Sequence, residues 1–319
     1  MRKLFLIRNS ELFQGRKYLN NKNRKNYFEG WYFKNTCGDI GISFIPGISI
    51  SKDENKAFIQ IITDDSSYYI DYDIDDFEYS DSPFYIKIGN NYFSKDKIHI
   101  DINDINKDIV IHVNVEYSNS VNIDTSLFSP SIMGPFLYMP FMECNHSVIS
   151  MKCSVNGMIC INDRKIIFND GDGYIEKDYG CSFPKSYIWC QGNSFSKKDA
   201  SFMMSIANIP FMFFNFRGLI CSLIVDGCEY RFATYNNSKI VKYDVRDNYL
   251  NIVLKKGHYY LDINCAFGNG LKLVAPVKGE MNKDIIESIT EVVSVCLKMD
   301  DEIIFEDNSR NCGLEIVYN

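Results

Sequence analysis

The side chains with the clearest chemical potential in this sequence lie in one short segment, residues 171–184. A β-strand, in which side chains alternate with period two, places Tyr174, Glu176 and Asp178 side by side on one face. If these carboxyl groups point into an apolar space, desolvation and like-charge repulsion raise the pKa of at least one above the ~4.3 of free Glu. A neutral carboxylic acid in such a pocket can protonate an alkene, so Glu176 and Asp178 are candidate catalytic acids, with Tyr174 beside them. The alternative is that both carboxylates and Lys177 form a structural network that locks two β domains together.

The strand expected next, residues 187–193, carries aromatic and polar side chains on a single face. That face contains Tyr187, Trp189, Gln191 and Asn193. Aromatic faces within about 6 Å stabilise a cation by ~0.5–2 kcal/mol each, which suits a carbocation formed away from water. We expect this face to contact the substrate beside the acids.

A second segment, residues 27–34, also places polar groups in apolar surroundings, which is unfavourable unless those groups are paired or used. A strand there has Glu29 and Trp31 on one face and Tyr32 and Lys34 on the other. We expect Glu29 and Trp31 to bind the substrate.

A third such segment, residues 134–146, ends in Glu143, Asn145 and His146. Glu143 and Asn145 share a strand face, and we expect both to bind the substrate. Histidine titrates near neutral pH, so His146 is a candidate general base for a phenolic proton, with Asn145 or Glu143 fixing its tautomer. The alternative is a core histidine bonded to a backbone carbonyl.

The sequence offers no cluster of His, Cys and carboxylate residues with the spacing of a metal site. Residues 169–173 resemble a calcium loop, but Phe168 and Tyr179 fall at the loop positions one and twelve, where carboxylates belong. We interpret residues 169–173 as a hairpin turn and predict a protein without metal or other cofactor.

The charge and the aromatic content of the chain limit the kinds of molecule that it is expected to bind. The net charge of -7 opposes the basic field that phosphate backbones require, which argues against nucleic acid. Aromatic residues make up 14% of the chain, and such rings suit half-buried strands and the walls of apolar cavities. We expect a hydrophobic small molecule as the partner.

The elements that position these residues are predicted to be strands. Ile109, Ile111, Val113 and Val115 alternate with more polar residues, and turn residues such as Gly89-Asn90 separate short apolar runs. No amphipathic pattern long enough for a substantial helix appears. We therefore predict an all-β protein of two antiparallel barrels or sandwiches, residues 1–185 and 186–319, with an apolar cavity near their junction.

The expected compartment is the cytoplasm. Eleven cysteines without a Cys-x-x-Cys pair indicate free thiols that fill core space. The apolar run Leu4–Ile7 is broken by Arg8 and is too short for a secretory signal. No stretch approaches the about 18 apolar residues of a membrane span.

Several of these segments together resemble the tocopherol cyclase family. Shorter similar stretches at residues 11–15, 229–235 and 275–281 extend the resemblance over nearly the whole chain. Tyr179 stands where the family tends to carry Trp, and Ser147 where Gly is common, and neither change removes an acid. The segments that carry the resemblance are Phe28-Glu29-Gly30-Trp31-Tyr32-Phe33-Lys34, the run from Gly134-Pro135-Phe136 to His146, and Gly173-Tyr174-Ile175-Glu176-Lys177-Asp178-Tyr179-Gly180 through Trp189-x-Gln191.

The resemblance implies a pair of lipocalin-like β-barrel domains, a geometry shared with carotenoid-hydratase-type proteins. It implies an intramolecular cyclase, independent of metal and redox cofactors, that protonates a prenyl double bond so that a phenolic oxygen of a hydroquinone closes a chromanol ring. In those relatives the acid stands in a Tyr-x-acid arrangement. This arrangement matches Tyr174-x-Glu176 and favours Glu176 over Asp178 as the proton donor.

Two other functions fit the same residues. One is a non-catalytic, lipocalin-like carrier of a hydrophobic ligand, in which the acids are structural. The other is an acid-catalysed hydratase or a cyclase of another polyene, because function belongs to the site and not to the fold. The composition, rich in Asn, Lys and Ile, indicates an AT-rich genome that need not encode a tocopherol pathway. The substrate, peripheral contact with a membrane and the oligomeric state therefore stay open.

Overall fold

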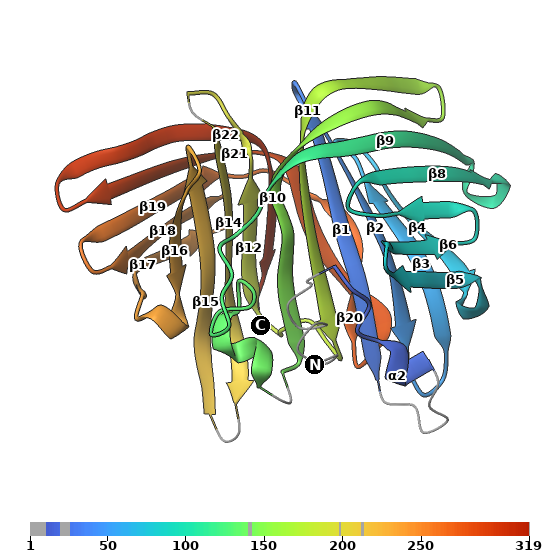
Figure 1. The fold of residues 1–319 in the computed structure, drawn as a ribbon, viewed down its shortest axis with the longest axis horizontal. Coiled ribbons are helices and arrows are strands. Elements are labelled where there is room, and N and C mark those ends of the chain that lie inside the picture. The colour runs from blue at the N-terminus through green and yellow to red at the C-terminus, as the bar shows by residue number, and fades with distance from the viewer. Residues whose placement is uncertain (1–10, 20–25, 140–141, 198, 212–213, 319) are drawn as a thin grey trace.

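The computed structural model describes residues 11–19, 26–139, 142–197, 199–211 and 214–318, which form two large antiparallel sheets that stand side by side (Figure 1). Sheet A has the order β4-β3-β2-β1-β11-β10-β9-β8-β7-β6-β5. The two edge strands of this order, β4 and β5, follow one another in the chain, and sheet A forms a nearly closed barrel. Its strands are β1 (Tyr27–Cys37), β2 (Ile40–Ile50), β3 (Asn55–Ile62), β4 (Ser67–Asp73), β5 (Phe77–Asp81), β6 (Phe84–Ile88), β7 (Asn91–Phe93), β8 (Lys97–Asp104), β9 (Ile109–Val121), β10 (Cys144–Ile161) and β11 (Arg164–Gly180).

Sheet B has the order β16-β15-β14-β12-β22-β21-β19-β18-β17, with β13 paired to β22 and β20 paired to β21. The β12 strand pairs with both β14 and β22 at the centre of this sheet. The strands are β12 (Tyr187–Gly192), β13 (Ser194–Phe195), β14 (Ala200–Phe211), β15 (Phe214–Val225), β16 (Cys228–Ala233), β17 (Lys239–Arg246), β18 (Tyr249–Lys256), β19 (Tyr259–Ala266), β20 (Leu271–Val277), β21 (Glu280–Met299) and β22 (Glu302–Val317).

Helical structure in the described residues is confined to very short segments. They are α2 (Arg16–Leu19), η1 (Ile74–Asp76), η2 (Ile105–Lys107), η3 (Gly134–Tyr138) and η4 (Thr234–Asn236). The predicted all-β, lipocalin-like architecture is therefore confirmed. Among these elements no helix has the length and apolar character needed to cross a bilayer. The run Leu4–Ile7 lies outside the described residues, and the division of the chain at residue 185 stays a prediction.

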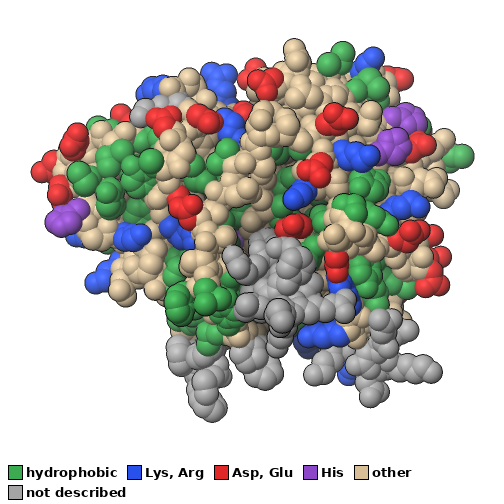
Figure 2. All heavy atoms as spheres, viewed as in Figure 1, with side chains coloured by type: hydrophobic (Ala, Val, Ile, Leu, Met, Phe, Trp, Pro, Cys, Tyr) green, Lys and Arg blue, Asp and Glu red, His purple; other side chains and the backbone are tan. Residues whose placement is uncertain are grey.

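Alternation along the strands produces the cores. In β9, Ile109, Ile111, Val113 and Val115 are buried and the residues between them are exposed, as period two predicts. Sheets A and B each enclose their own apolar core, and a third apolar cluster lies where the two sheets face each other. The eleven cysteines are free thiols, as predicted, but only five of them are buried in the core, and Cys228 is exposed. Acidic and basic side chains are interspersed over the face in Figure 2, with no field of one sign that would attract a polyanion.

The predicted hairpin turn at residues 169–173 is wrong. These residues lie inside β11, and the β10–β11 hairpin turns earlier, at Asn162. Between the pairs Gly157↔Phe168 and Val155↔Gly171, β10 advances two residues while β11 advances three. Asp170, with φ 56°, absorbs the extra residue as a bulge in the left-handed conformation, which Asp tolerates better than most residues. Polar turn-type residues here signal a bulge within a long strand.

The two faces of β1 have different environments. Trp31 and Phe33 belong to the core of sheet A. On the opposite face, the Lys34 ammonium donates to Gln191 Oε1 in β12 at 2.8 Å, and the Tyr32 hydroxyl donates to a carboxylate of β21. The β1 strand therefore forms the wall between the barrel of sheet A and the junction with sheet B.

On the barrel side, the fully buried Glu29 anchors the segment that precedes β1. Its carboxylate accepts from the backbone N–H groups of Gln14 and Gly15 at 3.0 Å and from the Tyr27 hydroxyl at 2.7 Å. Lys177 Nζ lies 3.1 Å from Glu29 Oε1. Glu29 and Lys177 therefore form a buried, fully hydrogen-bonded ion pair of the kind that holds elements together.

We predict that Glu29→Ala lowers the free energy of unfolding by ~3–5 kcal/mol, because it leaves the buried Lys177 ammonium without its carboxylate. Urea denaturation measures this change. Asp39→Ala is the matched control, since the Asp39–Arg310 pair is exposed and its loss should change stability by less than ~1 kcal/mol. Equal effects of the two substitutions would contradict the anchoring role.

Candidate active site

A cavity of about 160 Å³ lies at the junction of the two sheets. Strands of both sheets line it, as the predicted cavity near the junction requires. Its lining includes one imidazole and three carboxyl groups: His146 from β10, Glu176 and Asp178 from β11, and Glu315 from β22. Most of the remaining lining is apolar, and it includes Tyr32, Ile45, Met133, Phe136, Phe183, Tyr187, Trp189, Ala207, Phe216, Ile220, Leu273 and Ile285.

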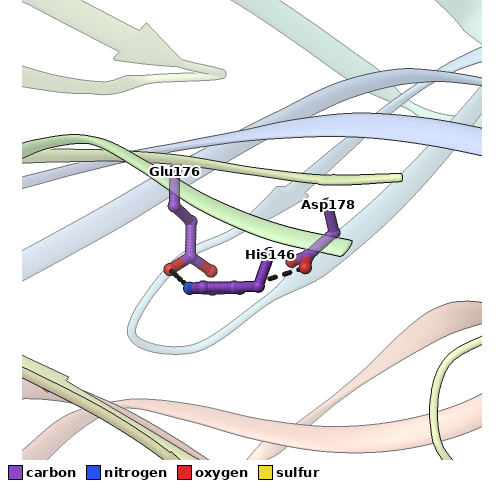
Figure 3. A group of neighbouring side chains, drawn as sticks. All are labelled: His146, Glu176 and Asp178. Carbon is purple, nitrogen blue, oxygen red and sulfur yellow. Dashed lines mark hydrogen bonds and ion pairs between the residues drawn. The ribbon is translucent and has the colours of Figure 1, made fainter. Parts of the chain in front are cut away.

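Strand register brings His146 between the two candidate acids. In the β10–β11 pair, His146 is opposite Asp178 and Val148 is opposite Glu176. The ring Nδ1 lies 3.0 Å from Asp178 Oδ1, and Nε2 lies 3.3 Å from Glu176 Oε2, the second contact being an ion pair without the alignment of a hydrogen bond (Figure 3). Burial opposes the charged form of the imidazole, but Asp178 and Glu176 outweigh it and raise the pKa of His146 well above its usual value. The cluster therefore contains an imidazolium at neutral pH.

Glu176 receives further donors at the same oxygen. The Tyr174 hydroxyl donates to Oε2 at 2.5 Å, and the Trp189 indole N–H donates to Oε2 at 3.2 Å from sheet B. Burial, followed by the Glu176 charge, raises the pKa of Tyr174 well above its usual value, so Tyr174 remains a neutral phenol that donates. Tyr174, Glu176 and Asp178 share one face of β11, and three groups converge on a single oxygen of Glu176.

The other sequence-predicted residues divide into two sets. Tyr187 and Trp189 line the cavity, and Tyr174 lies behind Glu176. Six of the predicted residues do not line the cavity. Glu29 and Trp31 lie on the barrel side of β1, and the backbone carbonyl of Glu143 accepts from the N–H groups of Cys181 and Ser182. Asn145 donates to the Tyr179 carbonyl, Gln191 accepts from Lys34, and Asn193 donates to the Gly173 carbonyl.

Two carboxyl groups that the sequence analysis missed stand on the opposite wall of the junction. Glu287 in β21 and Glu315 in β22 are direct partners in the strand register. Tyr32 donates to Glu287 Oε1, and Tyr187 donates to Glu315 Oε2, each at 2.5 Å. Burial raises the pKa of Glu287 to about 7 and that of Glu315 well above its usual value. The available signal was that Glu287 alternates with the apolar Ile285 and Ile289 on one strand face.

The donor atoms of His146, Glu176 and Asp178 lie within 4.8 Å of one another, a set that could in principle hold a cation. However, the two ring nitrogens of His146 face different carboxylates, Nδ1 facing Asp178 and Nε2 facing Glu176. An ion bound to one of these nitrogens would therefore lie beside one carboxylate and away from the other. A metal also requires a neutral imidazole, and the pKa of His146 is raised. This arrangement favours a salt-bridged cluster over a metal centre.

The family model described as tocopherol cyclase-like matches residues 124–317, which include His146, Glu176, Asp178 and both carboxyl groups of the opposite wall. The chain belongs to the tocopherol cyclase-like family. Its residues 124–317 contain β10 and β11 of sheet A and every strand of sheet B.

Two solved structures share the fold of this tocopherol cyclase-like protein. A Nitrosomonas europaea protein assigned as AttH has 10% identity and a TM-score of 0.56, with 97% of each chain covered. Kievitone hydratase from Nectria haematococca has 11% identity and a TM-score of 0.51, covering 92% of this chain and 89% of its own. No curated protein matches the chain.

The raised pKa of Glu287 predicts a pH-dependent stability. Between its ordinary value of 4.5 and about 7, the folded protein holds a proton that the unfolded chain has lost. The free energy of unfolding therefore decreases with rising pH in this window, by at most ~1.4 kcal/mol per pH unit. We expect Glu287→Gln to flatten this decrease in urea titrations between about pH 5 and about pH 8, and parallel curves would contradict the prediction.

We also predict that divalent metals do not stabilise the protein. The midpoint of thermal unfolding should be the same with chelator and with added Zn²⁺, because a ligand that binds the native state raises this midpoint. A Zn²⁺-dependent rise that His146→Gln abolishes would establish a metal site at the cluster.

Proposed function

We propose that this protein is an acid-catalysed cyclase that protonates a prenyl double bond and lets a phenolic oxygen of the same molecule close a chromanol-type ring. The observation that carries the proposal is Glu176, a nearly buried carboxyl group at an apolar cavity, whose Oε2 accepts from Tyr174 and Trp189. Membership of the tocopherol cyclase-like family supports the same reaction class.

Glu176 is the proposed proton donor. Because Tyr174, Trp189 and His146 all engage Oε2, the other oxygen, Oε1, carries the proton to the substrate. Transfer of this proton to the less substituted alkene carbon leaves a tertiary carbocation on the substrate and a carboxylate on Glu176. The His146 imidazolium, 3.3 Å away, stabilises that carboxylate, so we assign His146 to this role in place of the general base expected from the sequence.

The cavity walls suit the cation. Trp189, Tyr187 and Phe136 present aromatic rings to the cavity, and each ring face stabilises a cation by ~0.5–2 kcal/mol. The scarcity of polar lining limits capture of the cation by water. A phenolic oxygen of the same substrate is then the nearest nucleophile, and its attack forms the ring C–O bond while its proton leaves.

The volume of the cavity constrains the substrate. A space of about 160 Å³ is close to the ~150 Å³ cavity that binds benzene, so it admits a group about the size of one ring and favours a small substrate. A longer chain would extend beyond this space. Prenylhydroquinone is therefore a suitable probe.

We predict that Glu176→Gln lowers ring closure of prenylhydroquinone by about 10²-fold or more, because the amide keeps the volume but cannot deliver the proton. Liquid chromatography with mass spectrometry measures the isomer of equal mass, and a product heavier by one water would identify a hydratase. Binding, read from quenching of tryptophan fluorescence, should persist. Asp178→Asn should lower turnover less, since Asp178 contacts His146 and not the proposed donor.

Glu116→Gln, an exposed position on β9, is the matched control and should leave turnover unchanged. Ring closure by Glu176→Gln at nearly the wild-type rate would exclude Glu176 as the acid. Tight binding by the wild-type protein without turnover of prenylhydroquinone or of a polyene would identify a carrier.

A further inference from the structure

The Glu287–Glu315 pair has a buried atom that the reaction described above does not use. Glu287 Oε2 is buried and finds no N–H or O–H donor among the described residues. The direct partner of Glu287 in the strand register is Glu315, whose carboxyl group belongs to the same wall of the junction. A proton on one of two neighbouring buried carboxyl groups relieves their mutual repulsion and lets that group donate to the other, so this pair is suited to hold one proton.

The two carboxyl groups differ in access. Glu287 is fully buried, whereas Glu315 is partly exposed because it lines the cavity. Glu315 can therefore touch a substrate, and Glu287 can act only through Glu315. The titratable and charged groups that face the pair come from three other strands: Tyr32 and Lys34 of β1, Tyr187 of β12, and Glu176 and Asp178 of β11.

We propose that Glu315 accepts the proton that the substrate hydroxyl releases during ring closure, and that Glu287 stores it. As the substrate O–H bond breaks, its proton moves to Glu315, and the proton that Glu315 already holds moves to Glu287 Oε2. The ring C–O bond forms with the oxygen electron pair, so the substrate gains a proton at carbon from Glu176 and loses one at oxygen to Glu315. This inference rests on the proposed function, because it assigns the base for that reaction.

The electrostatics of the junction favour this order of proton transfers. A negative charge on Glu176 raises the pKa of both Glu287 and Glu315, although burial is the larger cause for each. Once Glu176 has delivered its proton, its carboxylate thus increases the proton affinity of the pair across the cavity. Return of the proton to Glu176 then restores both sites.

Glu315→Gln tests the proposal with a readout that separates the two steps. The amide keeps the volume and can still donate to Glu287, but it cannot accept a proton. In D₂O, Glu176 should still deuterate the alkene, and its carboxylate can remove a proton from a methyl group of the cation and regenerate an alkene. We expect ring closure to fall about 10²-fold while deuterium still accumulates on carbon in the recovered prenylhydroquinone.

The comparison variants decide between the roles. Glu176→Gln should abolish both deuterium uptake and ring closure, and Glu302→Gln, at the exposed start of β22, should change neither. Wild-type ring closure by Glu315→Gln would overturn the proposal. Loss of deuterium uptake to the same extent as in Glu176→Gln would also overturn it, since Glu315 would then serve the first step.

Glu287 is a positioning residue in this scheme, and its test is the pH profile. Glu287 can take up a proton only when it is ionised, so wild-type turnover should decrease as the pH drops below about 7. In Glu287→Gln the neighbouring negative charge is gone, Glu315 ionises more easily, and this acidic limb should move to lower pH. An unmoved limb would overturn the storage role.

A second measurement does not depend on turnover. Infrared difference spectra of the unliganded protein should contain the C=O band of a carboxylic acid that titrates near pH 7. The band should disappear in Glu287→Gln and persist in Glu176→Gln. If the wild-type protein neither deuterates nor closes the probe, the proposed function fails, and this band still decides whether the pair holds a proton. Its absence would overturn the inference.

Discussion

Burial of several carboxyl groups at the seam between two sheets is the constraint on which this structure depends. Each of three glutamates there accepts a hydrogen bond from a tyrosine hydroxyl: Glu176 from Tyr174, Glu287 from Tyr32 and Glu315 from Tyr187, each at 2.5 Å. Tyrosine is a neutral donor whose own pKa is raised by burial at all three positions. Neutral donors satisfy a buried carboxyl group without fixing it as an ion, so its proton can still move.

The contrast within the same pair of strands supports this reading. On the barrel side of β1 and β11, Glu29 pairs with Lys177 and binds two backbone N–H groups, an arrangement that fixes charge and anchors the segment before β1. On the junction side, Lys34 donates to Gln191, and the carboxyl groups face tyrosines, Trp189 and His146. One antiparallel strand pair thus has a buried structural ion pair on its barrel side and a group of carboxyl side chains with mostly neutral donors on its junction side.

Part of this arrangement could be predicted from the sequence. Period two places Tyr174, Glu176 and Asp178 on one face, because alternation is a local property of a strand. Local alternation does not determine which strand face meets the cavity. Glu29 and Trp31 have the same sequence pattern as the site residues but point into the barrel, because β1 has an apolar core on each side. Glu287 and Glu315 are neighbours only through the register of β21 and β22, which bulges shift. Asp170 likewise shows a turn-like composition that the long β10–β11 hairpin absorbs as a bulge.

The central claim is that an acid at the junction of the two sheets delivers a proton to a carbon atom of the substrate. The most direct test is the position and stereochemistry of deuterium in the product formed from prenylhydroquinone in D₂O. A protein-bound acid on one wall of the cavity approaches the alkene from a single face. We expect one deuterium per product molecule, on the carbon adjacent to the new quaternary centre and in a single configuration. Product without carbon-bound deuterium, or with equal amounts of both configurations, would contradict proton delivery by Glu176.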